Sequence, residues 1–247
     1  MSDQPETPAK QQSITINLSD LAKRYLGALQ RTYDTAAMVV QGTREVNERG
    51  YDEMTVAPRY LPSQKDRRPF ATAKPMAERW ILRNLLSDAF GLLIPFLEDV
   101  RTICALHAWK KAGSDQATLG VVFQEQRADF VKKNMEEKLA HLKSAHALDP
   151  ALSRNVASLE KLAACLVRND GTVPKEDPAL EVHLVSLDLV AAPEAPKKVQ
   201  PRMAETKKEF APGTEVELDK VEFMNVLATV ALFVNATLRL LQERVKE

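Results

Sequence analysis

The amino-acid sequence predicts an all-α fold, an up-and-down helical bundle of five or six helices with a small two-stranded β-ribbon near the C-terminus. Three observations predict it. Ala and Leu, both strong helix formers, make up about a quarter of the 247 residues. Only 8 residues are Gly, about half the ordinary share. Apolar residues recur along most of the chain at three- and four-residue steps, which is the spacing of one helix face.

Apolar spacing and capping residues predict five helical segments. These segments cover residues 19–48, 76–112, 114–147, 150–168 and 219–246. Pro95 interrupts the most apolar segment, so we expect one bent helix or two helices in a buried central position. Asp149 followed by Pro150 is typical of a helix start. Asp219 with Glu222 three residues later resembles a capping box and predicts the start of the last helix.

Two short segments near the C-terminus have the composition of strands. Residues 181–190 are rich in Val and Leu and contain neither Pro nor Gly, and residues 214–218 alternate between polar and apolar side chains. We expect the two segments to pair as the β-ribbon. Such a ribbon needs the helices beneath it for stability.

Proline and charge define the domain organisation. Residues 1–13 are polar and contain two prolines, which predicts a disordered tail. Residues 14–247 then form a single helical-bundle domain. Within it, the regions 50–75 and 191–212 each contain four prolines and an excess of basic residues. Prolines interrupt regular elements, so we expect a mobile basic loop at each region.

Charge, cysteine content and hydropathy limit the kinds of partner and the cellular location that the protein can have. The 34 Lys and Arg balance the 34 Asp and Glu, which excludes attraction of the whole protein to nucleic acid or anionic membrane as its main property. Two Cys cannot form a disulfide framework, which indicates a reducing, cytoplasmic location. We find neither an uninterrupted apolar run of transmembrane length nor a glycine-rich phosphate loop. We therefore expect no membrane contact and no cofactor. His141 and His146 lie five residues apart on one predicted helix, about 140° around its axis, which is a poor arrangement for a shared metal ion, so we expect no metal.

Candidate functional residues fall into two groups. The first is Arg101 with His107, a basic residue and a proton-transfer group on the most apolar helix. The second comprises basic residues that could contact phosphate or another anion, most of them in the two basic loops. They are Arg59, Lys65, Arg67, Arg68, Lys74, Arg168, Lys197, Lys198, Arg202, Lys207 and Lys208.

Residues 159–173 read LEKLAACLVRNDGTV, and this stretch resembles the end of the core helix in HEPN (higher eukaryote and prokaryote nucleotide-binding) domains. The resemblance extends over about residues 150–247 and rests on Cys165, Val167, Gly171 and Val173. Members of the family are α-helical bundles, and many are metal-independent ribonucleases of bacterial defence and toxin–antitoxin systems that act as dimers.

The catalytic residues of that family are replaced by other residue types in this chain. The family motif has Arg and Asn where this chain has Ala163 and Ala164, and His where this chain has Arg168. Since Ala can neither transfer a proton nor hold a phosphate, the resemblance implies a degenerate, non-catalytic copy.

Three hypotheses follow. The first is a non-catalytic binding protein that contacts a protein partner or the RNA backbone. Its apolar central segment and long amphipathic helices suit a homodimer interface. The second is an active metal-independent ribonuclease that uses Arg101 and His107. The third is a purely structural or scaffold bundle.

Overall fold

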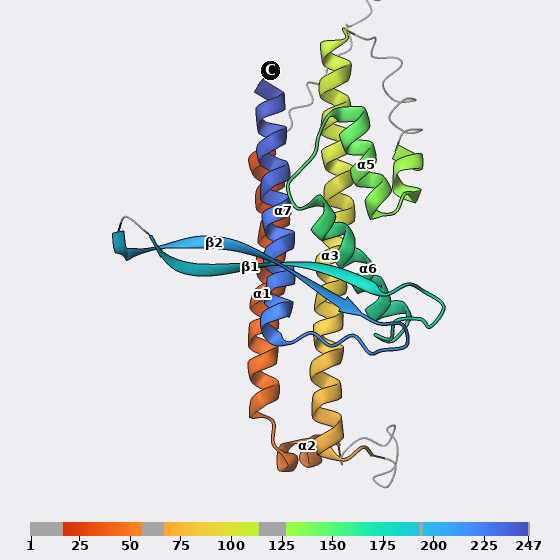
Figure 1. Ribbon diagram of the computed structural model, residues 1–247, viewed down its shortest axis with the longest axis vertical. Helices are drawn as coiled ribbons and strands as arrows, with labels where there is room; N and C mark the ends of the chain where they lie inside the picture. Colours follow the sequence, from red (N-terminus) through yellow and green to blue (C-terminus); the bar gives the residue numbers. More distant parts are fainter. Residues whose placement is uncertain (1–16, 56–66, 114–126, 193–194, 247) are drawn as a thin grey trace, which may run out of the picture.

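The computed structural model describes residues 17–55, 67–113, 127–192 and 195–246, and within 187–202 it describes the backbone alone (Figure 1). It confirms the predicted fold class, a mostly helical bundle with one two-stranded antiparallel sheet near the C-terminus. The predicted tail 1–13 lies outside the described residues.

Two long helices form the spine of the molecule. Helix α1 (Leu18–Glu45) begins at Asn17, whose side chain accepts a hydrogen bond from the Ser19 backbone. After the short helix α2 (Glu48–Thr55) and residues outside the description, α3 (Phe70–Lys111) returns antiparallel to α1. The predicted basic loop 50–75 is therefore wrong over most of its described part, because α2 and the start of α3 occupy it.

Helix α3 is one continuous helix of 42 residues that contains both Pro75 and Pro95. Of the two arrangements predicted around Pro95, the single helix is observed. Each proline removes one helical hydrogen bond. Buried Leu93, Phe96 and Leu97 flank Pro95 and anchor the helix to the core on both sides, so tertiary packing outweighs that loss.

The predicted helix 114–147 is not one element in its described part. A short helical segment, 127–132, ends before Asn134, and Asn134 caps the separate helix α5 (Met135–His146). Helix α6 (Ser153–Arg168) begins three residues later than Pro150 suggested. The predicted cap, Asp149, forms an ion pair with Lys143 at 2.7 Å instead.

The β-ribbon is longer than predicted, and its second strand lies elsewhere. Strand β1 (Leu180–Ala192) pairs antiparallel with β2 (Ala195–Phe210), with Leu180 opposite Phe210. The predicted basic loop 191–212 is therefore wrong, because most of it is this strand. Both strands of a two-stranded sheet are edges, and an edge strand tolerates the prolines that suggested a loop.

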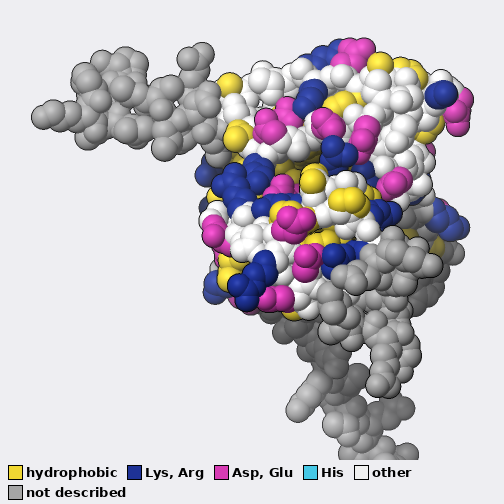
Figure 2. Space-filling view, turned by 90° about the horizontal axis from the view of Figure 1, so that it is seen from below, with side chains coloured by type: hydrophobic (Ala, Val, Ile, Leu, Met, Phe, Trp, Pro, Cys, Tyr) yellow, Lys and Arg dark blue, Asp and Glu magenta, His cyan; other side chains and the backbone are white. Residues whose placement is uncertain are grey.

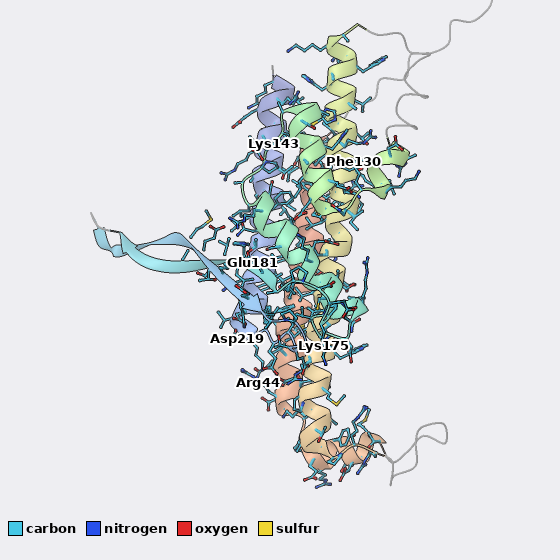
Figure 3. The ribbon with its side chains drawn as sticks, turned by 45° about the vertical axis from the view of Figure 1, so that its right-hand side comes forward. Arg44, Phe130, Lys143, Lys175, Glu181 and Asp219 are labelled. Atoms are coloured by element: carbon cyan, nitrogen blue, oxygen red, sulfur yellow. The ribbon has the colours of Figure 1, made fainter. Side chains whose placement is uncertain are left out.

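Residues 214–218 do not form the second strand. Thr172 and Glu215 make an isolated bridge, and the segment then leads into α7 (Lys220–Lys246). The predicted capping box is confirmed: the Asp219 amide donates to Glu222 Oε2 at 2.9 Å, and the Glu222 amide donates to Asp219 Oδ1 at 2.8 Å. Asp219 lies at the foot of α7 (Figure 3).

One hydrophobic core joins these elements. The first half of β1 packs on α6 and α7, and α7 packs on α1, while the outer end of the ribbon projects away from the helices (Figure 1). Within the described ranges, α7 alone is long and apolar enough to cross a membrane. Half of its most apolar stretch is buried inside the protein. The core helix of a folded domain is apolar for the same reason, so its composition alone does not indicate a membrane span.

Candidate functional site

A hollow of about 850 Å³ lies where α5 begins and α6 ends. Ala164, Cys165 and Arg168 of α6 line it, so it contains two of the three positions at which the resemblance to HEPN domains places catalytic residues. Five basic side chains contribute to its wall, against three acidic ones. The basic residues are Lys132, Lys133, Lys138, Lys161 and Arg168, and the acidic residues are Glu160, Asp177 and Glu181.

The turn after α6 lies beside the hollow, which its flanking residues Asn169 and Val173 line. Gly171 adopts a positive φ of 76°, and its amide donates to the Cys165 carbonyl at 3.2 Å. The Gly171 carbonyl accepts a hydrogen bond from the Val216 amide at 2.7 Å. The turn is thus closed from both sides, which holds Arg168 at the edge of the hollow.

Arginines of α3 attach this turn to the body of the protein. Arg83 pairs with the Asp170 carboxylate and donates to the Asp170 carbonyl at 2.8 Å. Arg79 forms ion pairs with Glu215 at 2.8 Å and with Glu217 at 2.9 Å. The network connects α3 with both segments that form the turn.

Some of the basic side chains around the hollow are already engaged within the protein. Lys138 is buried and donates to the carbonyls of Val131 and Lys133. Burial also lowers the Lys138 pKa. Lys161 forms an ion pair with Glu136 at 2.7 Å.

The other basic side chains of the hollow face outward. Lys132 and Arg168 are exposed and Lys133 is partly exposed. In the described part of the chain, none of the three forms an ion pair. They are therefore the cations of this hollow that an added anion can reach without displacing an existing partner.

The cysteine in the hollow is not suited to nucleophilic chemistry. Cys165 is buried and its thiol donates to the Thr172 carbonyl at 3.4 Å. Burial raises the Cys165 pKa, and it raises the pKa of Cys104 to about 11. Because the thiolate is the reactive form, both cysteines remain protonated and weakly reactive at neutral pH.

The predicted anion contacts whose side chains are described do not converge on one surface. Arg59 and Lys65 lie outside the described residues. Lys197, Lys198 and Arg202 lie in β2, where only the backbone is described. Of those predicted contacts whose side chains are described, Arg168 alone lines the hollow.

Four further predicted anion contacts are used inside the protein. Arg67 pairs with Asp52 at 2.7 Å, and Lys74 donates to two carbonyls at the end of α1, both at 2.9 Å. Lys207 pairs with Glu181 at 2.7 Å, at the base of the ribbon, and Lys208 pairs with Glu222 at 2.7 Å. Arg68 is exposed.

The surface seen from below also shows basic side chains that are spread out and not gathered in one patch. Figure 2 shows Lys and Arg interspersed with Asp and Glu on that face, with hydrophobic side chains between them. Neither positive nor negative charge dominates this face.

Arg101 and His107 lie on different sides of α3. Six residues along a helix place two side chains about 120° apart around the axis and 9 Å apart along it. Arg101 is 1% exposed and lies over the Phe130 ring, 5.8 Å from its centroid. His107 instead lines a separate hollow together with Leu148 and Arg244.

Sequence reasoning missed a histidine pair beside Arg101. The His141 and His146 rings lie 5.7 Å apart, edge to face, and His141 also contacts Phe130. Five residues along one helix suggested diverging side chains. The two rings nevertheless contact each other, and both residues are partly exposed. Helical spacing alone does not predict this contact. Among the described residues, no group of three His, Cys, Asp or Glu could hold a metal ion.

Comparison with protein-family models, with curated proteins and with solved structures found no match.

Proposed function

We propose that this protein is a non-catalytic helical-bundle binding protein that contacts the phosphate backbone of RNA at the hollow around Arg168. One observation carries the proposal. Lys132, Lys133 and Arg168 surround a hollow of about 850 Å³ and form no ion pair within the described ranges. Lys and Arg contacts to backbone phosphates give affinity without sequence specificity.

The residues at the motif positions of the resemblance support a binding role. Ala163 and Ala164 offer no group for proton transfer, and Arg168 is charged at every physiological pH, so it cannot serve as a base. This is the behaviour that a degenerate HEPN domain would have. A cytoplasmic role in a bacterial defence or toxin–antitoxin module, with an additional protein partner, belongs to the same proposal.

The two alternatives have less support. A ribonuclease that uses Arg101 and His107 would need two side chains that lie on different sides of α3 to meet at one phosphate. A pure scaffold would leave the three outward-facing cations around the hollow without a role.

We expect the triple variant Lys132→Ala, Lys133→Ala, Arg168→Ala to bind single-stranded RNA of mixed sequence about tenfold more weakly at low salt. Loss of up to three phosphate contacts should also reduce the slope of log affinity against log salt by about 2. Filter binding over a salt series measures both quantities.

A matched control removes the same charge elsewhere. Lys23, Lys110 and Lys111 are exposed, lie away from the hollow and form no ion pair within the described ranges, so the triple Ala variant at these positions should keep most of the affinity. RNA affinity that is absent even at low salt would favour the scaffold. RNA cleavage without divalent metal, abolished by His107→Ala, would establish the ribonuclease instead.

A further inference from the structure

The lower part of the α1–α3 pair is poorly covered by the rest of the protein. We call residues 31–55 and 70–84 the stalk; the lower ends of α1 and α3 run past the start of α7 and end at α2 (Figure 1). Ala36 is the one buried residue among the described residues of the stalk. Yet the stalk holds six of the twelve exposed large hydrophobic side chains of the described chain, namely Tyr33, Met38, Val46, Met54, Met76 and Trp80.

One stripe of α1 in the stalk is apolar or uncharged in its middle and charged at its ends. Arg31, Thr35, Met38, Gly42 and Glu45 follow four- and three-residue steps, so they lie within an arc of about 80° around the helix axis. All five are exposed, and Met38 is 75% exposed. At Gly42, an added Cβ would meet nothing within 4 Å, which leaves room for another backbone to approach.

The order of these five residues is self-complementary. Arg31 and Glu45 lie at equal distances along the chain from Met38, seven residues on each side. If a second copy of α1 packs antiparallel about a two-fold axis at Met38, each Arg31 lies opposite Glu45 of the other copy. A parallel arrangement would instead place like charges together, which is unfavourable.

We propose that this stripe of α1 is a homodimer interface, at which a second copy of the chain packs antiparallel with the two Met38 side chains at its centre. A two-fold interface uses the same surface on both copies, as this stripe allows. The apolar part of α3 from Leu85 to Cys104, one of the surfaces on which a homodimer was expected to form, is largely buried in the core of its own chain. This interface is independent of the hollow around Arg168.

Charge reversal tests the proposed pairing directly. In sedimentation equilibrium of the full chain, we expect Arg31→Glu and Glu45→Arg each to weaken the dimer about tenfold, since every reversal acts twice across the two-fold axis. The double variant Arg31→Glu, Glu45→Arg restores opposite charges and should return to nearly the original dissociation constant. Because both residues are exposed, circular dichroism should show unchanged folding.

Two further variants separate this interface from other surfaces. Met38→Lys should abolish the dimer, whereas Val167→Lys, which changes a hydrophobic side chain of α6 that is 58% exposed, should leave it intact. A wild-type chain that stays monomeric at high micromolar concentration would overturn the proposal. A double reversal that fails to restore the dimer would overturn it as well.

Discussion

Replacement of Gly171 by Ala should destabilise the protein by about 2–3 kcal/mol, the largest single-site effect we predict. Gly171 has a φ of 76°, a conformation that costs a residue with a Cβ roughly 1–2 kcal/mol. The added Cβ would also lie 2.5 Å from Arg83 Nη2. Arg83 would have to move away from Asp170 and Glu215, which removes charged hydrogen bonds that hold the turn. Urea unfolding followed by circular dichroism measures the loss.

A second glycine provides the matched control. Gly91 lies inside α3, and an added Cβ there would meet nothing within 4 Å. Gly91→Ala should therefore stabilise the protein by about 0.5–1 kcal/mol, because Ala has less conformational entropy to lose in a helix. Equal unfolding midpoints for the two variants would contradict the role assigned to the Gly171 turn.

Local patterns predicted the helices well where the sequence contains a complete capping or packing signal. Asp219 and Glu222 identified the start of α7 because both partners of the capping box lie within four residues. The three- and four-residue apolar spacing within residues 19–48 identified the buried face of α1, on which Leu21, Tyr25 and Leu29 lie. These signals are local, so one segment of sequence contains all of the information needed.

Patterns that depend on tertiary context were misleading. Pro75 predicted an interruption, and Pro95 predicted either a bend or an interruption, but α3 is one continuous helix across both, with packing on both sides of Pro95. Pro196 and Pro201 predicted a loop, but they lie in β2, one of two edge strands in a ribbon. In both cases the cost of proline depends on neighbours that are distant in sequence.

At the candidate site too, local sequence patterns were informative, whereas features that depend on tertiary contacts were missed. Sequence reasoning found Arg168 through the resemblance around α6, but it did not associate Arg168 with Lys132 and Lys133, which are more than thirty residues away in the chain. It also counted Lys74 and Lys208 as anion contacts, although both lie near carbonyls or carboxylates of the protein itself. The number of basic residues predicts charge, but only the fold shows which cations remain available.

The histidine pair on α5 should make stability depend on pH between about 4 and 6.5. Burial, with His141, Arg244 and Arg101 nearby, lowers the pKa of His146 to about 4. The unfolded chain, with an ordinary His pKa near 6.5, therefore binds more protons in this range. The free energy of unfolding should fall as the pH drops from about 6.5 to 4. The full linkage corresponds to about 3 kcal/mol, and we expect about 2 kcal/mol because solvent reaches part of the ring.

The His146→Gln variant tests this dependence, because glutamine keeps a polar side chain but cannot titrate. It should lose most of the decrease in unfolding free energy between pH 6.5 and 4, measured by urea unfolding at several pH values. A residual decrease should persist, since burial also lowers the His141 pKa. Ser144→Ala, on the exposed side of the same helix, should keep the wild-type profile.

His146 lies at the C-terminus of α5, where the helix dipole favours a protonated His by up to about 1 kcal/mol. If the unfolding free energy of His146→Gln depended on pH as that of the wild type does, the attraction of the helix dipole would cancel the effect of burial on the His146 pKa. The imidazole would then be protonated in the folded protein as readily as in the unfolded chain.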